Sequence, residues 1–396
     1  MNVIYLDNNA TTKVAPEVVE TMLPYLSEFY GNPSSMHSFG GDVAEKIKAA
    51  RGHVAALIGA ASADEIVFTS CGTESDSTAI RAAIESHPNK RHIVTSRVEH
   101  PAVKNLYETL SKKGYRVSFV PVDSEGRLDL DYLYDNLSDD TAIVSLMWAN
   151  NETGVIFPIE EISREIRDRG IVFHTDAVQA AGKIPINVDA TGIDMLSLSG
   201  HKFHAPKGIG VLFIRKGTKF SPFMIGGHQE KGRRGGTENV SSIIALGKAA
   251  ELAGRHLEEN GYERVGKLRD KLEATLLSQI GNSMVNGDRK HRLLNTTSIA
   301  FEYVEGEAIL LMMNEHGICA SSGSACTSGS LEPSHVLRAM GVPFTAAHGS
   351  IRFSLSRYTT EEEIDVVIDK MPAIIERLRK MSPFWKQAVG MKAEKA

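Results

Sequence analysis

One stretch of the chain indicates both a fold and a site: Met195-Leu196-Ser197-Leu198-Ser199-Gly200-His201-Lys202-Phe203-His204-Ala205-Pro206-Lys207-Gly208. The apolar run at residues 193–198 predicts a short buried strand. The turn at residues 199–201 then places Lys202 at the carboxyl end of that strand. A lysine there is either a solvated surface residue, which is the commoner case, or a reactive amine in a pocket.

A reactive lysine needs special surroundings, because a free amine with a pKa near ~10.4 is protonated at neutral pH. A desolvated and positively biased site makes the amine nucleophilic. His201, His204 and Lys207 are the neighbours expected to supply the positive bias. The role of Lys202 therefore depends on which other residues the fold brings to it.

Working outward, apolar strand patterns alternate with helical patterns, which predicts an α/β fold with a mainly parallel sheet covered by helices. A smaller α+β domain is expected after it. We expect residues 16–255 to form the large domain, and residues 1–15 with 256–396 to form the small one. The predicted strands are residues 65–69, 92–96, 117–120, 142–147, 171–175, 193–198 and 210–215, and one long helical pattern spans 243–280.

Composition excludes several classes of function. The chain has 396 residues and a net charge of −5, without long runs of one sign, so neither nucleic acid nor an anionic membrane is an expected partner. It contains no apolar run of the ~18 residues that a membrane span needs, and no signal peptide is recognisable, so we expect a cytoplasmic protein. Three cysteines without zinc-site spacing predict neither a disulfide framework nor a resident metal.

Polar residues follow several of the predicted strands, where ligands bind in such sheets. Asp176 could simply be a turn or N-cap residue. Together with a Schiff-base lysine, however, it suits pyridoxal phosphate, whose ring nitrogen needs a carboxylate partner. The turn at residues 70–75 offers backbone N–H groups to a phosphate, Gln179 could donate to the ring hydroxyl, and His100 could lie against the ring.

Two loops carry further signals. Residues 320–329 are small and surround Cys326, which favours an exposed, reactive or sulfur-carrying thiol over a buried apolar one. Cys319 lies in an apolar run and is expected to be buried, and Cys71 is given the same reading. The glycine- and arginine-rich residues 226–239 are either a phosphate contact or a hinge between domains.

At this point the chain resembles, over nearly its whole length, the cysteine desulfurases, which are pyridoxal-phosphate enzymes of the fold-type-I aminotransferase superfamily, class V branch. Residues 381–396 are similar to the nitrogen-fixation type rather than to the longer tail of the housekeeping type. The motifs that carry the resemblance are Tyr5-Leu6-Asp7-Asn8-Asn9-Ala10-Thr11-Thr12, Gly31-Asn32-Pro33-Ser34-Ser35, Glu99-His100, Asn150-Asn151-Glu152-Thr153-Gly154, His174-Thr175-Asp176-Ala177-Val178-Gln179, Ser199-Gly200-His201-Lys202, Gly235-Gly236-Thr237-Glu238-Asn239, Ser322-Gly323-Ser324-Ala325-Cys326 and Ile351-Arg352-Phe353-Ser354-Leu355-Ser356.

The resemblance implies a role for each matching residue. Lys202 is the implied Schiff-base lysine. Thr237 is implied to reach the cofactor of the neighbouring subunit, so the resemblance also implies a homodimer. Asn151 and Arg352 are the implied pair for the substrate carboxylate. The remaining implied cofactor contacts are Gly72, Thr73, His100, Asn151, Asp176, Gln179, Ser199 and His201.

The implied reaction converts L-cysteine to L-alanine. The Cys326 thiolate takes the substrate sulfur as a persulfide, and His100 assists proton transfer. The sulfur then passes to an iron–sulfur scaffold protein, where Cys326 transiently touches a nascent cluster, and nitrogenase maturation is the expected destination. The alternatives are a housekeeping desulfurase, a selenocysteine lyase, an aminotransferase, or a non-catalytic sulfur-delivery protein.

Overall fold

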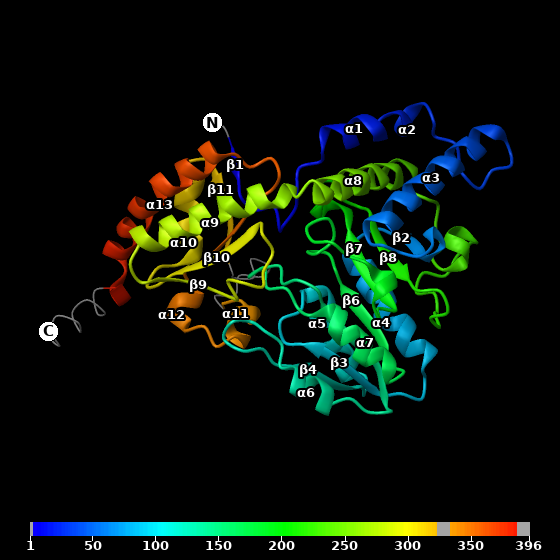
Figure 1. The fold of residues 1–396 in the computed structure, drawn as a ribbon, viewed down its shortest axis with the longest axis horizontal. Coiled ribbons are helices and arrows are strands. Elements are labelled where there is room, and N and C mark those ends of the chain that lie inside the picture. The colour runs from blue at the N-terminus through cyan, green and yellow to red at the C-terminus, as the bar shows by residue number, and fades with distance from the viewer. Residues whose placement is uncertain (1–2, 323–332, 386–396) are drawn as a thin grey trace.

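The structure is a computed structural model that describes residues 3–322 and 333–385. Among these residues the larger sheet has seven strands (Figure 1). The neighbouring pairs from β7 to β4 are parallel, whereas β8 is antiparallel to both β7 and β2, so the predicted mainly parallel sheet is confirmed. The spatial order is β2 (Ile66–Thr69), β8 (Gly210–Ile214), β7 (Met195–Ser199), β6 (Val172–Asp176), β5 (Thr141–Met147), β3 (His92–Ser96) and β4 (Arg116–Val120).

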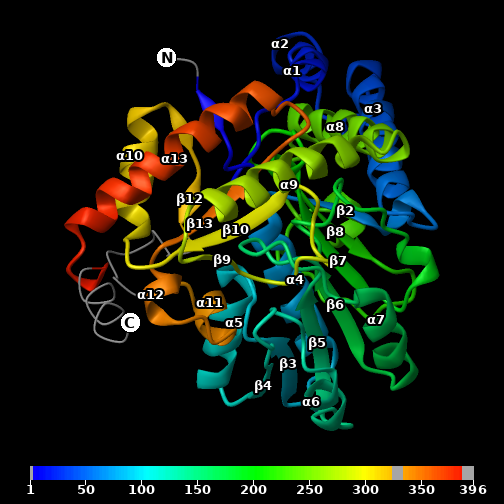
Figure 2. The same ribbon diagram turned by 60° about the vertical axis from the view of Figure 1, so that its left-hand side comes forward.

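Helices cover both faces of this sheet, with α4 and α7 on opposite sides in Figure 2. The helix α3 packs along α8 at the far end of the same unit. The helices of this unit are α1 (Pro16–Met22), α2 (Pro24–Ser27), α3 (Ser38–Leu57), α4 (Gly72–Ser86), α5 (Pro101–Lys112), α6 (Leu130–Asp135), α7 (Ile159–Asp168) and α8 (Val240–Glu258), with 3-10 turns η1 (Ala63–Glu65), η2 (Val188–Ala190), η3 (Gly200–Lys202) and η4 (Gln229–Gly232).

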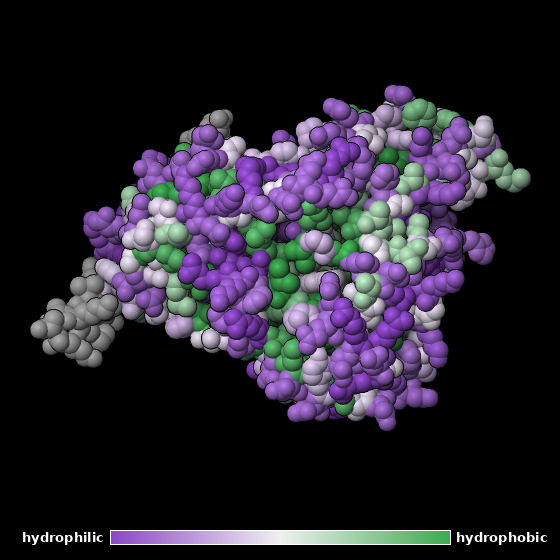
Figure 3. All heavy atoms as spheres, viewed as in Figure 1, coloured by the Kyte–Doolittle hydropathy of each residue, from purple (hydrophilic) through white to green (hydrophobic). Residues whose placement is uncertain are grey.

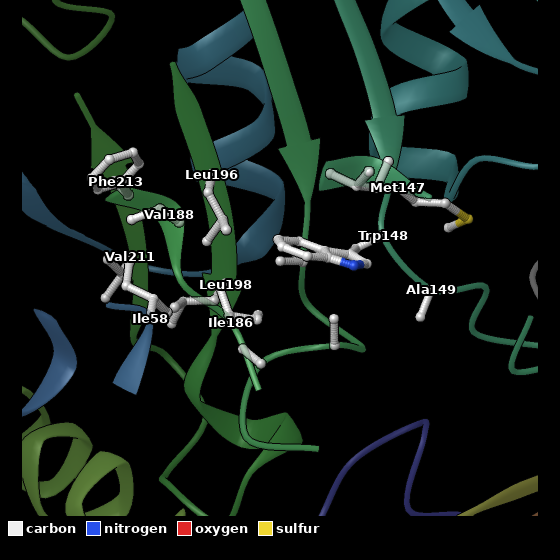
Figure 4. Close-up of a cluster of buried hydrophobic side chains, with 14 of the residues drawn as sticks. Ile58, Met147, Trp148, Ala149, Ile186, Val188, Leu196, Leu198, Val211 and Phe213 are labelled. Atoms are coloured by element: carbon white, nitrogen blue, oxygen red, sulfur yellow. The ribbon is translucent and has the colours of Figure 1, made fainter. Parts of the chain in front are cut away.

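Alternate residues of one strand face opposite sides of a sheet, and the buried side chains here divide in that way. Met195 of β7 and Leu212 of β8 pack with α4 and α5. Leu196 and Val211, their neighbours in sequence, pack with the helices of the other face. Figure 4 shows part of this second cluster, where strand residues meet Ile58. Burial on both faces therefore explains why these strands are largely apolar.

A second unit has its own core and a four-stranded antiparallel sheet, β12 (Ser321–Ser322), β13 (Ser350–Ser354), β10 (Thr296–Phe301) and β9 (Ser283–Val285). The N-terminal segment joins this unit, because β1 (Ile4–Tyr5) pairs with β11 (Ile318–Cys319) and Asp7 bridges to Ser354. Its helices are α9 (Gly261–Gln279), α10 (Gly306–Glu315), α11 (His335–Ala339), α12 (Phe344–Ala347) and α13 (Glu361–Met381). The proposed division into residues 16–255 and the rest stays a prediction; we note that α11 packs on the larger core.

The single long helix expected over residues 243–280 was wrong. Two helices, α8 and α9, are separated at Asn260, which adopts a left-handed conformation with φ 53°. Asn is one of the few residues besides Gly that tolerates this conformation, and Gly261 follows it. The apolar periodicity continues across the break because both helices face buried clusters. No helix among the described residues is long and apolar enough to cross a membrane.

Candidate active site

A cavity of about 400 Å³ lies at the carboxyl ends of the parallel strands, within the usual size range of small-molecule sites. It collects residues from the N-terminal segment, the start of α4, the ends of β3, β5, β6 and β7, and β13. This is the convergence that the sequence predicted for most of the candidate residues. The lining residues are Asn9, Ala10, Cys71, Gly72, Thr73, Asp76, His100, Met147, Ala149, Asn151, Asp176, Val178, Gln179, Ser199, His201, Lys202 and Arg352.

Lys202 stands at the end of the short turn η3 that follows β7. Its Nζ donates to the carbonyl oxygens of Asn9 at 2.6 Å and Ala10 at 2.8 Å. Burial lowers the pKa of Lys202 to about 8, and the charge of Arg352 adds to the effect. A useful fraction of this amine is therefore unprotonated near neutral pH.

The expected source of positive bias was wrong. His201 and His204 are themselves held neutral, because burial lowers the pKa of each to about 4. Lys207 is exposed and outside the cavity. Arg352, which is about 150 residues away along the chain, is the cation that acts on Lys202. Sequence proximity therefore pointed to the wrong residues.

Asp176 ends β6 and is buried. Its Oδ1 accepts from the N–H of Val178 at 2.9 Å. Burial raises the pKa of Asp176, and His100 and the Val178 N–H only partly offset this effect. Asp76 of α4 also lines the cavity, and burial together with the Asp176 charge raises its pKa well above the usual range. The pKa of Asp76 is raised further than that of Asp176, so Asp176 is the first of these two carboxyl groups to ionise.

His100 lies at the N-cap position of α5, where its Nδ1 accepts from the N–H of Ala102 at 3.2 Å. The residue as a whole is exposed, but partial desolvation of its ring at the cavity wall and the charge of Lys202 lower its pKa, whereas Asp176 raises it. Because Nδ1 already accepts a hydrogen bond, the neutral ring carries its hydrogen on Nε2, and proton exchange takes place at that nitrogen. That state suits an acid–base group, as the sequence predicted.

The start of α4 provides an anion site. Gly72 and Thr73 lie at the open end of a 15-residue helix, where the first N–H groups have no partner within the helix. A side chain at position 72 would place its Cβ 2.9 Å from Cγ2 of Val178, so any residue other than glycine would require Val178 to shift. Ser199 and His201 line the cavity as well, and His201 Nδ1 lies 3.1 Å from the Thr11 hydroxyl.

Arg352 is the cation of the β13 side of the cavity. Its Nη1 donates to the Asn151 carbonyl at 3.0 Å and its Nη2 to Asp7 Oδ1 at 2.7 Å. Its Nε is buried without a partner. A guanidinium with an unused N–H suits a ligand carboxylate. On the other side, Gln179 donates from Nε2 to the Asn9 carbonyl at 2.9 Å.

One predicted residue lies away from this cavity, and another lies outside the described residues. Thr237 lines a different hollow of about 150 Å³, together with Ser70 and Gly208. Cys326 lies outside the described residues, and so does most of its loop. The loop at 226–239 is not an interdomain hinge, because Arg234 pairs with Glu74 at 2.8 Å and Arg51 pairs with Glu230 at 2.7 Å within the larger unit.

The expected burial of two cysteines was also wrong. Cys71 is half-buried and lines the cavity at the start of α4, and Cys319 is half-buried on β11 beside a surface hollow. The described residues contain no group of three metal-ligating side chains.

Sequence reasoning missed several residues that the structure places around Lys202: Asp7, Asn9, Asp76 and Lys183. Asp7 and Asn9 belong to a motif that carries the resemblance, but the sequence indicated no role for them at the site. Lys183 is buried and donates to Gln179 Oε1 at 2.7 Å and to Asn9 Oδ1 at 3.2 Å. A lysine four residues after Gln179, in an otherwise apolar stretch, was the available signal.

Comparison with known families assigns the chain to a class. The family model "Aminotransferase class-V" matches residues 4–367, so the chain belongs to this family. Within it, the chain belongs to the cysteine desulfurases. It is 61% identical to a cysteine desulfurase of a Nostoc species, over 98% of this chain and 97% of the relative.

Two further relatives agree with this assignment. The chain is 60% identical to "Cysteine desulfurase NifS" of Azotobacter vinelandii, over 96% of this chain and 95% of that protein. Among solved structures, a "NIFS-like protein" superposes with a TM-score of 0.89 at 39% identity, covering 95% of this chain and 100% of that one. The enzyme class and the fold expected from the sequence are thus confirmed.

Proposed function

We propose that this protein is a pyridoxal-phosphate-dependent enzyme that removes sulfur from L-cysteine and leaves L-alanine. The observation that carries the proposal is the Lys202 amine, with its pKa lowered to about 8, in a cavity that also contains the buried side chains of Asp176 and Arg352. Lysine, aspartate and arginine are the groups required for a Schiff base, a ring nitrogen and an amino-acid carboxylate. The names of the similar proteins support the choice of cysteine.

The residues present fit pyridoxal phosphate. Asp176 has a carboxylate oxygen that accepts no hydrogen bond within the described chain, which leaves it for a protonated ring nitrogen. Gly72, Thr73, Ser199 and His201 would hold the phosphate at the start of α4. Gln179 has a second amide hydrogen for the ring oxygen, and His100 and Asn151 line the remaining walls. When bound, the cofactor would act as an acceptor for the electrons of a substrate carbanion.

Each side chain of the site has a separate role in the proposed reaction. Arg352, with the carbonyl of Asn151 beside it, binds the substrate carboxylate. The Lys202 amine moves the proton at the substrate Cα, and His100 accepts or returns a proton at the thiol. The Cys326 thiolate attacks the substrate sulfur, so that an S–S bond forms while the carbon–sulfur bond breaks and its electron pair stays with carbon. Protonation of that carbon leads to L-alanine, and the persulfide remains on Cys326.

The proposal extends to a homodimer. Several large apolar side chains are exposed between the end of α1 and the start of α3, and Figure 3 shows pale green apolar atoms among hydrophilic ones at that end of the molecule. A monomer rarely leaves such a group uncovered, and a second copy would bring Thr237 toward the partner's cavity. The exposed residues are Leu23, Leu26, Phe29, Tyr30, Met36 and Phe39.

We further propose that Cys326 passes its sulfur to an iron–sulfur scaffold protein, in nitrogenase maturation. The support is the similarity to the Azotobacter relative printed as NifS. A general role in cluster assembly is the alternative.

The cofactor claim can be tested directly. Full-length protein loaded with pyridoxal phosphate is reduced with borohydride and digested, and the modified peptide is identified by mass spectrometry. A reduced adduct on Lys202 supports the proposal, and an adduct on Lys183, with Lys202 unmodified, would contradict it. The Lys202→Ala protein, which lacks the amine, serves as the control.

A further inference from the structure

The N-terminal segment makes direct contact with two groups of the proposed site. Asp7 accepts from Arg352 at 2.7 Å, and the carbonyls of Asn9 and Ala10 accept from Lys202. The Asp7 side chain is 21% exposed and that of Arg352 is 9% exposed. The pair is thus largely removed from solvent, where charge interactions are stronger than at a surface. The N-terminal segment therefore supplies hydrogen-bond acceptors to Arg352 and Lys202.

The segment is also fixed in place. The N–H of Asn8 donates to the Ser354 carbonyl, and the N–H of Asn9 donates to the Ser354 hydroxyl at 2.9 Å. The Asn9 amide donates to Thr296 Oγ1 at 2.9 Å and to the Asn151 carbonyl at 3.2 Å. Because these contacts reach both units, the position of Asp7 relative to Arg352 is set by the folded structure.

The guanidinium is held from two sides, by Asp7 at Nη2 and by the Asn151 carbonyl at Nη1. Arginine has five N–H donors in a planar fork, so two anchoring bonds leave Nε and other N–H groups for a ligand. Asp7 therefore orients the guanidinium without using all its donors. It also places one negative charge beside the positive charge that acts on Lys202.

We propose that Asp7 is a positioning residue of the active site: it holds Arg352 for the substrate carboxylate and balances the Arg352 charge at the Lys202 amine. The inference rests on the proposed roles of Lys202 and Arg352 in binding cofactor and substrate. It adds that the carboxylate at position 7 sets how much of the Lys202 amine is unprotonated.

Other charged groups surround this amine. Arg352 lowers the pKa of Lys202, and Asp176 and Asp7 raise it. The amine also interacts with His100, His201 and Lys183, whose own pKa values it lowers. Since these three groups favour their neutral forms, Asp7, Asp176 and Arg352 are the charges that matter near neutral pH.

The test uses two substitutions with opposite signs. Asp7→Asn removes the negative charge with little change in shape. The pH at which half of the Lys202 amine is protonated, the midpoint, should therefore fall by about 0.5 to 1 unit, as expected for the loss of a nearby charge. Arg352→Gln removes the positive partner, so the midpoint should rise. Damage to the fold would not move the midpoint in opposite directions. Asp42→Asn, on the exposed face of α3, gives the same change in net charge and should leave the midpoint unchanged.

The measurement is competitive acetylation of the full-length chain before cofactor loading, with the Lys202 peptide followed by mass spectrometry as a function of pH. The acetylation of Lys202 does not depend on turnover. The role of Asp7 can therefore be disproved while the desulfurase proposal stands, and the desulfurase proposal can be disproved while the role of Asp7 stands. After loading, the KM for L-cysteine of Asp7→Asn should rise, with partial recovery in Asp7→Glu. An unchanged midpoint or an unchanged KM in Asp7→Asn would overturn the inference, as would an equal midpoint shift in Asp42→Asn.

Discussion

His174 Nε2 lies 3.7 Å from Asp76 Oδ1, and both side chains are almost fully buried beneath the cavity. The same ring nitrogen lies 2.9 Å from the Ser197 hydroxyl, and Nδ1 lies 2.8 Å from that of Ser145. Burial lowers the pKa of His174 to about 3. The pair is therefore a neutral imidazole beside a neutral acid, not an ion pair, and Asp176 is the carboxyl group of this region that ionises before Asp76.

This assignment predicts different results for two similar substitutions. Asp176→Asn removes the charge proposed for the ring nitrogen and should lower kcat/KM by about 10²-fold or more, on the scale of losing a key electrostatic group. Asp76→Asn replaces one neutral group by another and should cost much less. Steady-state kinetics with L-cysteine and the visible spectrum of each loaded protein measure both effects. Equal losses in the two variants would mean that Asp76 also carries charge.

A second prediction concerns stability and pH. Burial raises the pKa of Glu99 to about 8, whereas an unfolded glutamate ionises near ~4.3. The folded state thus keeps a proton that the unfolded state has lost. The stabilisation is complete below about pH 4.3 and is lost as the pH rises through 8.

Glu99→Gln cannot ionise, so its stability should fall less than that of the wild type between about pH 5 and pH 8. Thermal unfolding at several pH values, with the cofactor state held the same, gives the comparison. Glu108→Gln on the exposed face of α5 is the matched control and should follow the wild type. Parallel curves for Glu99→Gln and the wild type would show that Glu99 is already ionised in the folded protein.

A third prediction tests the homodimer. Leu26 is 58% exposed among the apolar residues of α1 to α3, and Leu26→Glu should weaken association by placing a charge in the interface. Leu311→Glu is the control, since Leu311 is 71% exposed on α10, in the other unit. Light scattering after size-exclusion chromatography reports the mass. If Thr237 serves the neighbouring subunit, Leu26→Glu should also lose cofactor on dilution; a dimer that survives the change would place the interface elsewhere.

The sequence predicted most strands of the larger sheet to within a few residues, because strands buried on both faces form short, continuous apolar runs. It also predicted that Lys202, Asp176 and His100 would meet, since strand ends in a parallel sheet share one edge. It did not predict the break at Asn260, where the apolar pattern continues across a left-handed residue.

The sequence predicted which residues line the site better than it predicted which of them contact one another. The cation that acts on Lys202 is Arg352, and the carbonyls that hold its amine belong to residues 9 and 10. These contacts join segments that are distant in sequence, and local pattern contains no information about them. A buried lysine such as Lys183 contradicts the usual expectation for its residue type, so only the packed structure reveals it.

The central claim is that Cys326 receives the sulfur of L-cysteine. The most direct test measures alanine and sulfide released from L-cysteine with a thiol reductant, in the wild type, Cys326→Ala and Cys71→Ala, with the visible spectrum of each. We predict that all three proteins bind the cofactor. The wild type and Cys71→Ala should each release one alanine for every sulfide, whereas Cys326→Ala should release neither product at a comparable rate. Full activity of Cys326→Ala would show that sulfur leaves without this thiol and would contradict the proposed mechanism.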